Sequence, residues 1–201
     1  MSDIKNIEQH YSLDERPFLE KVRGFCQLVD DRYSPYLTDF LNPREIQIVE
    51  ELAHYYNLKF FVSSTPESEE YGRVILAPEY YELDDDDFEI KRLEISYARQ
   101  FNKLTHPKVL GALINQLGLD RQVFGDIILD EKGRVQFSIA SHLASYAIMT
   151  ITKIGNVSVT LKEVSKDDWI SNQENYSQSF VLLSSMRLDN VLATVLNLSR
   201  S

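Results

Sequence analysis

The segment that decides the fold reads Val123-Phe-Gly-Asp-Ile-Ile-Leu-Asp-Glu-Lys-Gly-Arg-Val-Gln-Phe-Ser-Ile139. Its two ends are rich in β-branched and aromatic residues, which favour strands. A polar tetrapeptide separates them, and its last residue, Gly133, supplies the positive φ that short hairpin loops require. The segment therefore predicts two antiparallel strands, Val123 to Leu129 and Arg134 to Ile139, joined by a tight turn.

The elements around this hairpin follow a known order. Alternating residues predict a strand from Phe88 to Tyr97, and helical spacing of apolar residues predicts a helix from His106 to Leu117. A second helix is expected from Ser141 to about Lys153, and a strand from Asn156 to Val164. The order β-α-β-β-α-β is that of the split βαβ sandwich, a four-stranded antiparallel sheet backed by two helices. We expect these residues between helices and sheet: Leu110, Leu113, Leu117, Leu143 and Ile148.

The first eighty residues predict a separate small α/β domain. Apolar residues at three- and four-residue steps predict a helix from Pro17 to Tyr33. Asn42-Pro43 is a typical helix start, with Asn as N-cap, so a second helix is expected to run to about Asn57. Two short strands follow, Leu58 to Ser63 and Arg73 to Ala77.

The acidic run Glu82 to Asp87 separates the two units. Four adjacent carboxylates repel one another and are costly to bury, which indicates a solvated linker. The run lacks the alternating ligand spacing of a calcium loop, so we expect no metal site in it. The predicted fold class is α+β. The expected domains are residues 1–82, an α/β domain; 88–183, an RNA-recognition-like domain with an extra strand from Ser179 to Leu183; and 184–201.

Composition and charge limit the classes of function. Apolar residues make up 43% of the 201-residue chain, and no stretch approaches eighteen consecutive ones, which predicts a protein without membrane contact. The single cysteine, Cys26, lies on an apolar helical stripe and fits a reducing cytoplasm. The net charge is −13 over residues 1–90 but +3 over residues 91–201. Any contact to nucleic acid is therefore expected in the second half, because phosphates require local positive charge.

No catalytic motif is evident. The four histidines, His10, His54, His106 and His142, lie on separate predicted elements, and the spacings of zinc proteases, phosphate loops and nucleophile elbows are absent from the sequence. We therefore expect no enzyme activity, no cofactor and no small-molecule substrate.

The C-terminal segment carries a first resemblance. It reads Ser185-Met-Arg-Leu-Asp-Asn-Val-Leu-Ala-Thr-Val-Leu-Asn-Leu-Ser-Arg-Ser201. This resembles the opening of the RNA-binding domain named after ribosomal protein four of the small subunit, whose first helix begins Arg-Leu-Asp, continues Leu-Ala and leads to Ser-Arg. That domain normally continues for tens of residues, so we expect residues 184–201 to be the start of a truncated module. An ordinary amphipathic helix is the alternative.

The resemblance of this segment implies RNA contacts. Arg187 and Arg200 can engage phosphates through forked guanidinium groups. Asp189 is better suited to cap or orient, and Ser199 precedes the second arginine. These four residues are the site that the resemblance implies for the segment.

A longer resemblance lies in Leu104-Thr-His-Pro-Lys-Val-Leu-Gly-Ala-Leu-Ile-Asn-Gln-Leu-Gly-Leu-Asp-Arg-Gln-Val-Phe-Gly-Asp-Ile127. The stretch resembles the signature of the YlmH family of bacterial RNA-binding proteins. The shared features are a histidine-initiated helix, a Leu-Gly-Ala-Leu core, a Leu-Gly turn, an arginine and a Gly-Asp-Ile strand. Gly118 and Gly125 are interpreted as turn glycines. In the first domain the family often has a glycine-rich basic stretch, where this chain has Glu70-Tyr-Gly-Arg-Val74.

The family resemblance implies a function. It implies binding without turnover to the large ribosomal subunit carrying a stalled peptidyl-tRNA, in ribosome-associated quality control, with rRNA and tRNA as partners. An adaptor that binds proteins through the acidic first domain is the alternative. An enzyme acting on RNA would require a convergent acid–base pair, which the sequence does not offer.

The predicted sheet offers few aromatic residues for stacking bases. Its central strands contain Phe137, which is as well suited to the core, and Tyr97. We therefore expect a basic rim of Arg121, Lys132 and Arg134 to contact the RNA backbone instead.

Overall fold

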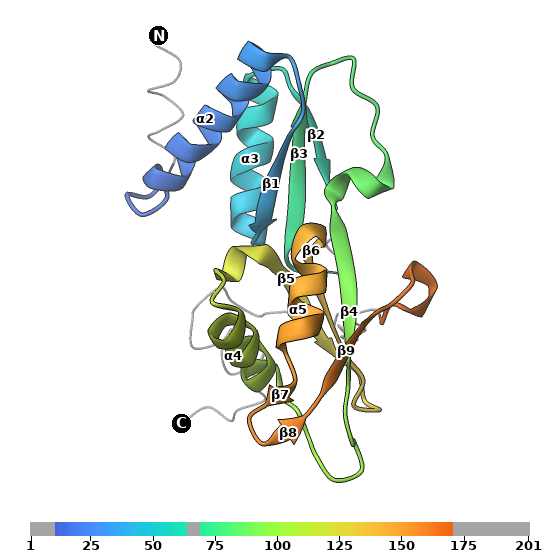
Figure 1. The fold of residues 1–201 in the computed structure, drawn as a ribbon. Helices are drawn as coiled ribbons and strands as arrows, with labels where there is room; N and C mark the ends of the chain where they lie inside the picture. Colours follow the sequence, from blue (N-terminus) through green and yellow to red (C-terminus); the bar gives the residue numbers. More distant parts are fainter. Residues whose placement is uncertain (1–10, 64–68, 171–201) are drawn as a thin grey trace, which may run out of the picture.

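The computed structural model describes residues 11–63 and 69–170 of the chain. Two antiparallel sheets, each with its own helices and core, are stacked end to end (Figure 1). The predicted α+β class is confirmed. Within the described residues, no helix is long and apolar enough to cross a membrane.

The first unit is a three-stranded sheet with two helices on one face (Figure 1). The strands pair antiparallel in the order β1-β3-β2. Both helices and the last two strands agree closely with the sequence prediction. The elements are α2 (Arg16–Arg32), β1 (Tyr36–Leu41), α3 (Pro43–Tyr55), β2 (Lys59–Val62) and β3 (Gly72–Ala77).

The strand β1 was not predicted from the sequence. Its register shifts between Leu37 and Phe40, so the side chains do not alternate regularly. Thr38, polar but 1% exposed, faces inward and its Oγ1 accepts a hydrogen bond from the Val74 backbone N–H at 2.9 Å. A bulge and an inward-facing polar residue together hide the period-two pattern that identifies a strand.

A capping box begins helix α3, and helix α2 contributes a buried cysteine to the core. The Asn42 side chain accepts from the Glu45 N–H, and Glu45 accepts from the Asn42 N–H, each at 2.9 Å, which forms a capping box. The α2 helix buries Cys26 completely, and burial raises the pKa of its thiol to about 11. A thiol of that pKa stays protonated at neutral pH, so Cys26 is a core residue.

The second unit has the predicted split βαβ topology. Its strands pair antiparallel in the order β5-β6-β4-β9, with α4 and α5 packed on one face. Gly133 has a φ of +74° in the turn between β5 and β6, as the hairpin requires. The elements are β4 (Ile90–Ser96), α4 (His106–Leu117), η2 (Arg121–Val123), β5 (Phe124–Leu129), β6 (Val135–Ala140), η3 (Ser141–Leu143), α5 (Ala144–Thr150) and β9 (Thr160–Glu163).

The end of this unit differs from the prediction in detail. The expected helix begins as the single turn η3, and α5 ends at Thr150. The expected strand from Asn156 to Val164 is divided, because a two-stranded hairpin of β7 (Lys153–Ile154) and β8 (Val157–Ser158) precedes β9. Gly155 opens the hairpin turn with a φ of +59°, a conformation that favours glycine.

The core of the second unit lies between the helices and the sheet. Leu113 and Leu117 are buried there, as predicted. Leu110, Leu143 and Ile148 pack against the same core but are partly exposed.

The acidic run is exposed as expected, but it is an ordered turn. Asp85–Phe88 forms the 3-10 helix η1, and a capping box joins Asp84 and Asp87. The Tyr81 hydroxyl donates to Asp87 Oδ2 at 2.5 Å. Two of the four carboxylates therefore cap their own turn, so the solvated linker contains an ordered turn.

Candidate nucleic-acid interface

The two units meet at Gly125, in β5. A Cβ placed there would lie 2.7 Å from Phe40 Cε1 and 2.9 Å from Ser138 Cβ. Phe40 comes from β1 of the first unit, and Ser138 from β6. The interpretation of Gly125 as a turn glycine is therefore wrong, since its missing side chain lets Phe40 approach the sheet. Gly118 does end α4 with a φ of +63°.

The next residue, Asp126, fixes the same junction. Its Oδ2 accepts hydrogen bonds from the backbone N–H groups of Glu70 at 2.6 Å and Tyr71 at 3.2 Å. The Arg121 guanidinium lies over the Tyr71 ring, 4.1 Å from its centroid, and donates to the Phe124 carbonyl. Three residues of the signature quoted above, Arg121, Gly125 and Asp126, thus join the two units.

Arg73, in the stretch that departs from the family pattern, is also structural. Its guanidinium donates to the carbonyls of Thr38 at 2.8 Å, Phe88 at 3.0 Å and Glu89 at 3.1 Å. The side chain is almost completely buried, and this burial lowers the pKa of Arg73. Arg73 therefore holds the first unit to the start of β4.

The sheet face opposite α4 and α5 is polar and buried. Arg92, Glu94, Gln136 and Ser138 alternate with core residues on β4 and β6, and each is at most 6% exposed. We call these four residues the polar sheet face. Burial lowers the pKa of Arg92 to about 10, so it remains charged at neutral pH. Burial raises the pKa of Glu94, but hydrogen bonds from Arg134 and Gln136 lower it below its usual value.

Residues 165–170, which we call the strap, cover this face. Gln136 Nε2 donates to the Asp168 carbonyl, and Gln136 Oε1 accepts from the Ile170 N–H, both at 2.9 Å. The Arg92 guanidinium lies 4.2 Å from the Trp169 ring centroid and forms an ion pair with Glu69. A face that stacks bases in RNA-recognition domains is therefore occupied by the chain itself.

The two aromatic residues considered for stacking lie in different environments. Phe137 is fully buried and packs against Phe124 in the core, with 6.4 Å between ring centroids. Tyr97 is partly exposed, and its hydroxyl donates to the Gly133 carbonyl at 2.9 Å. Phe137 is thus a core residue, and base stacking on it is excluded.

The structure does not gather the three expected rim residues. Arg121 precedes β5 at the junction, whereas Lys132 and Arg134 lie beyond the other end of that strand. Arg134 Nη2 bonds Glu94 Oε2 at 2.9 Å, which partly neutralises its charge. Lys132 is exposed, and no hydrogen bond or ion pair of its side chain occurs within the described ranges. The expected contacts Arg187, Asp189, Ser199 and Arg200, and the expected strand Ser179 to Leu183, lie outside the described residues.

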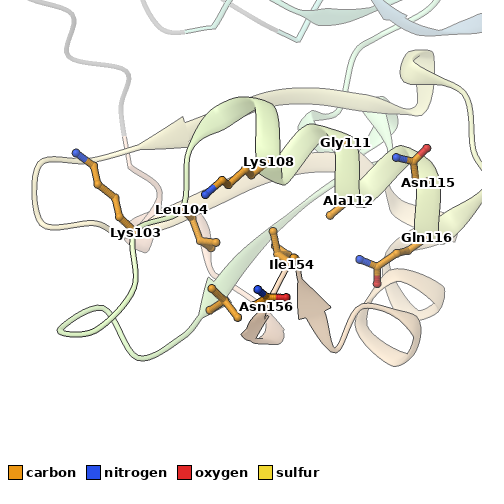
Figure 2. Close-up of a pocket in the computed structure, with 11 residues that line it drawn as sticks. Lys103, Leu104, Lys108, Gly111, Ala112, Asn115, Gln116, Ile154 and Asn156 are labelled. Carbon is orange, nitrogen blue, oxygen red and sulfur yellow. The ribbon is translucent and has the colours of Figure 1, made fainter.

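A groove runs between α4 and the β7–β8 hairpin. It has a volume of about 540 Å³ and holds Lys103 and Lys108 toward one end and Asn115 and Gln116 toward the other (Figure 2). We call it the α4 groove. Gln116 Nε2 donates to the Lys153 carbonyl at 2.7 Å and so ties the helix to the hairpin. Its lining residues are Lys103, Leu104, Lys108, Gly111, Ala112, Asn115, Gln116, Ile154, Gly155, Asn156 and Val157.

The spacing of small and polar residues along α4 explains why the groove forms there. Lys108, Gly111, Ala112 and Asn115 are spaced i, i+3, i+4 and i+7, so they share one side of the helix. Val109, Leu113 and Leu117 form the buried side. Two small residues between a lysine and an amide leave a hollow, which an apolar helical pattern does not reveal because it identifies only the buried side of the helix.

No metal centre is formed by the described part of the chain. Groups of three or more His, Cys, Asp or Glu side chains in metal-binding geometry are absent from residues 11–63 and 69–170.

Comparison with known proteins identifies the family. Residues 84–168 match the model described as "Putative RNA-binding domain in YlmH". The chain is 32% identical over 197 residues to "Ribosome-associated protein quality control protein P2" of Bacillus subtilis (strain 168), covering 98% of this chain and 76% of that one. The chain belongs to the YlmH family. A solved structure, "Cell division protein ylmH from Streptococcus pneumoniae", shares 41% identity and a TM-score of 0.69, covering 78% of this chain and 94% of that one.

The matched YlmH domain coincides with a structural unit. Residues 84–168 begin at the cap of η1 and end at η4 in the strap. They therefore include the polar sheet face, most of the strap and the α4 groove. The resemblance found in the sequence is confirmed.

Proposed function

We propose that this YlmH-family protein is a ribosome-associated RNA-binding factor that acts without catalysis in ribosome-associated quality control. Its site of action is the cytoplasm, and its partners are rRNA of the large subunit and peptidyl-tRNA. The observation that carries the proposal is the combined similarity. A putative RNA-binding domain matches residues 84–168, and a relative named for ribosome-associated quality control aligns with 98% of the chain.

The charge distribution supports RNA binding by the second half. Residues 91–201 have a net charge of +3 in a chain whose total is −10. Exposed Lys132, partly exposed Arg134 and the C-terminal residues Arg187, Ser199 and Arg200 are the proposed contacts, with Asp189 in a capping or orienting role. Arg121 is a weaker candidate, since its guanidinium already contacts Tyr71 and the Phe124 carbonyl.

Co-sedimentation with ribosomal subunits tests this function. We expect the chain to sediment with large subunits that carry peptidyl-tRNA and to bind vacant small subunits more weakly. Between about 50 and 200 mM salt, log affinity is expected to fall linearly with log salt, because each phosphate contact releases counterions. Salt-insensitive binding, or binding to proteins but not to RNA, would support the adaptor function of the acidic first domain instead.

A further inference from the structure

We infer that the α4 groove is a binding site for an unpaired RNA segment, with the backbone phosphates on Lys103 and Lys108 and one base between α4 and the β7–β8 hairpin. The inference deepens the proposed function and rests on it. The groove lies on the helix side of the domain, away from the polar sheet face that the strap covers.

The charge of the groove fits a polyanion. Both lysines that line it are exposed, and none of its lining residues is acidic. The groove is therefore locally positive in a chain with 31 acidic and 21 basic residues. Within the described ranges, neither lysine forms an ion pair with a carboxylate, so both ammonium groups remain available to phosphates.

The rest of the lining fits a nucleobase. The apolar floor consists of partly exposed Val157, against which a base face can pack, and of Leu104 and Ile154, which are each 2% exposed. Asn115 and Asn156 are exposed at its sides, and an amide both donates to and accepts from base edges. A volume of about 540 Å³ lies in the range of small-molecule sites, which is roughly 300–1,000 Å³.

An unpaired segment fits better than a duplex. A base can enter the groove only if it is unstacked, and bases of loops and single strands are the ones that proteins splay out. A duplex would offer only its outer phosphates to the two lysines. The proposed ligand is therefore a loop or single-stranded segment of RNA.

Gly111 allows the groove to be blocked without disturbing the fold. A Cβ added at this position meets no atom within 4 Å, so a longer side chain would extend into the groove. Gly111→Gln fills the space with a neutral, helix-favouring side chain and leaves both lysines in place. Gly111→Ala makes the same backbone change with little occlusion and is its matched control.

The test is fluorescence anisotropy of a labelled single-stranded RNA of about ten nucleotides with the 201-residue chain. Lys103→Ala/Lys108→Ala is expected to bind about tenfold more weakly, with a salt slope smaller by about 1.4, since each phosphate contact contributes about 0.7 on single strands. Gly111→Gln is expected to weaken binding similarly, while Gly111→Ala binds as the unchanged chain does. The control Lys91→Ala/Lys162→Ala removes two exposed lysines of the same domain outside the groove.

Several outcomes would overturn the groove site and leave the proposed function intact. One is an equal loss of RNA affinity in Lys103→Ala/Lys108→Ala and Lys91→Ala/Lys162→Ala. Another is undiminished RNA binding by Gly111→Gln. A third is tighter binding of a duplex than of the single strand. Binding of an apolar peptide that Gly111→Gln abolishes, without competition by RNA, would assign the groove to a protein partner. Absence of salt-dependent RNA binding by the unchanged chain, together with no co-sedimentation with ribosomal subunits, would overturn both proposals.

Discussion

Gly125→Ala is expected to lower the free energy of unfolding by about 2–3 kcal/mol, because the added methyl group overpacks the junction between the units. The new Cβ would lie 2.7 Å from Phe40 Cε1 and 2.9 Å from Ser138 Cβ. The Phe40 ring can shift, but Ser138 Cβ is fixed to β6. The loss is measured by urea denaturation followed by circular dichroism.

Gly111→Ala is the matched control for this prediction. It is the same substitution in the same domain, but its Cβ meets nothing within 4 Å, so removal of a helical glycine should raise stability by up to about 1 kcal/mol. Phe40→Leu should reduce the cost of Gly125→Ala in a double-mutant cycle, because a smaller side chain faces the added methyl group. Equal effects at the two glycines would contradict the close approach at the junction.

Arg92→Met is expected to cost about 3–5 kcal/mol, the loss typical of breaking a buried ion pair from one side. The side chain of Arg92 is 3% exposed and that of its partner Glu69 is 12% exposed. Arg92 also donates to Ser138 Oγ at 3.2 Å and to the Ile170 carbonyl at 3.1 Å. Methionine has a similar length but satisfies none of these groups, so it should also loosen the strap.

The neighbouring Lys91→Met is the control for that variant. Lys91 is 47% exposed in its ion pair with Glu163, and such surface pairs contribute at most about 1 kcal/mol. Trp169, the only tryptophan of the chain, reports on the strap through its fluorescence. We expect acrylamide to quench Trp169 more strongly in Arg92→Met than in Lys91→Met. Equal quenching and equal stability would show that Arg92 does not hold the strap.

The regular elements of both units could be predicted from the sequence because each combines a clear period with a clear boundary. The helix His106–Leu117 has an apolar stripe, and Gly118 ends it. The helix after Asn42 begins with a capping box. By contrast, β1 contains a bulge, and the hairpin around Gly155 interrupts an apparent single strand. Short interruptions of this kind are too local for a periodic pattern to reveal.

The polar sheet face shows why the surroundings of side chains were harder to predict than the regular elements. On β4, Arg92 and Glu94 alternate with Leu93 and Ile95, which is the pattern of a strand with one solvated face. The sequence gives no sign that Asp168 and Ile170, more than thirty residues beyond Gln136, cover that face. A polar residue in a strand can face water or a buried network, and only the tertiary structure distinguishes them.

The rim residues Arg121, Lys132 and Arg134 were predicted from their charge. Charge does not indicate which groups a side chain contacts in the folded chain. Arg121 and Arg134 are engaged with Tyr71 and Glu94, respectively. Lys103 and Lys108 have no such partners within the described ranges and face a hollow that depends on Gly111 and Ala112. The arrangement of small residues beside a charge, rather than the charge itself, distinguishes the candidate site.

We propose that the domain binds RNA through its helix side while the strap occupies its sheet face. Ultraviolet crosslinking of the chain to large ribosomal subunits, followed by mass spectrometry of the crosslinked peptides, tests it most directly. We predict crosslinks within residues 103–116 and 153–157, and their loss in Gly111→Gln. Crosslinks concentrated on Gln136, Ser138 or Trp169, with none in the groove, would contradict it, because RNA would then have displaced the strap from the sheet.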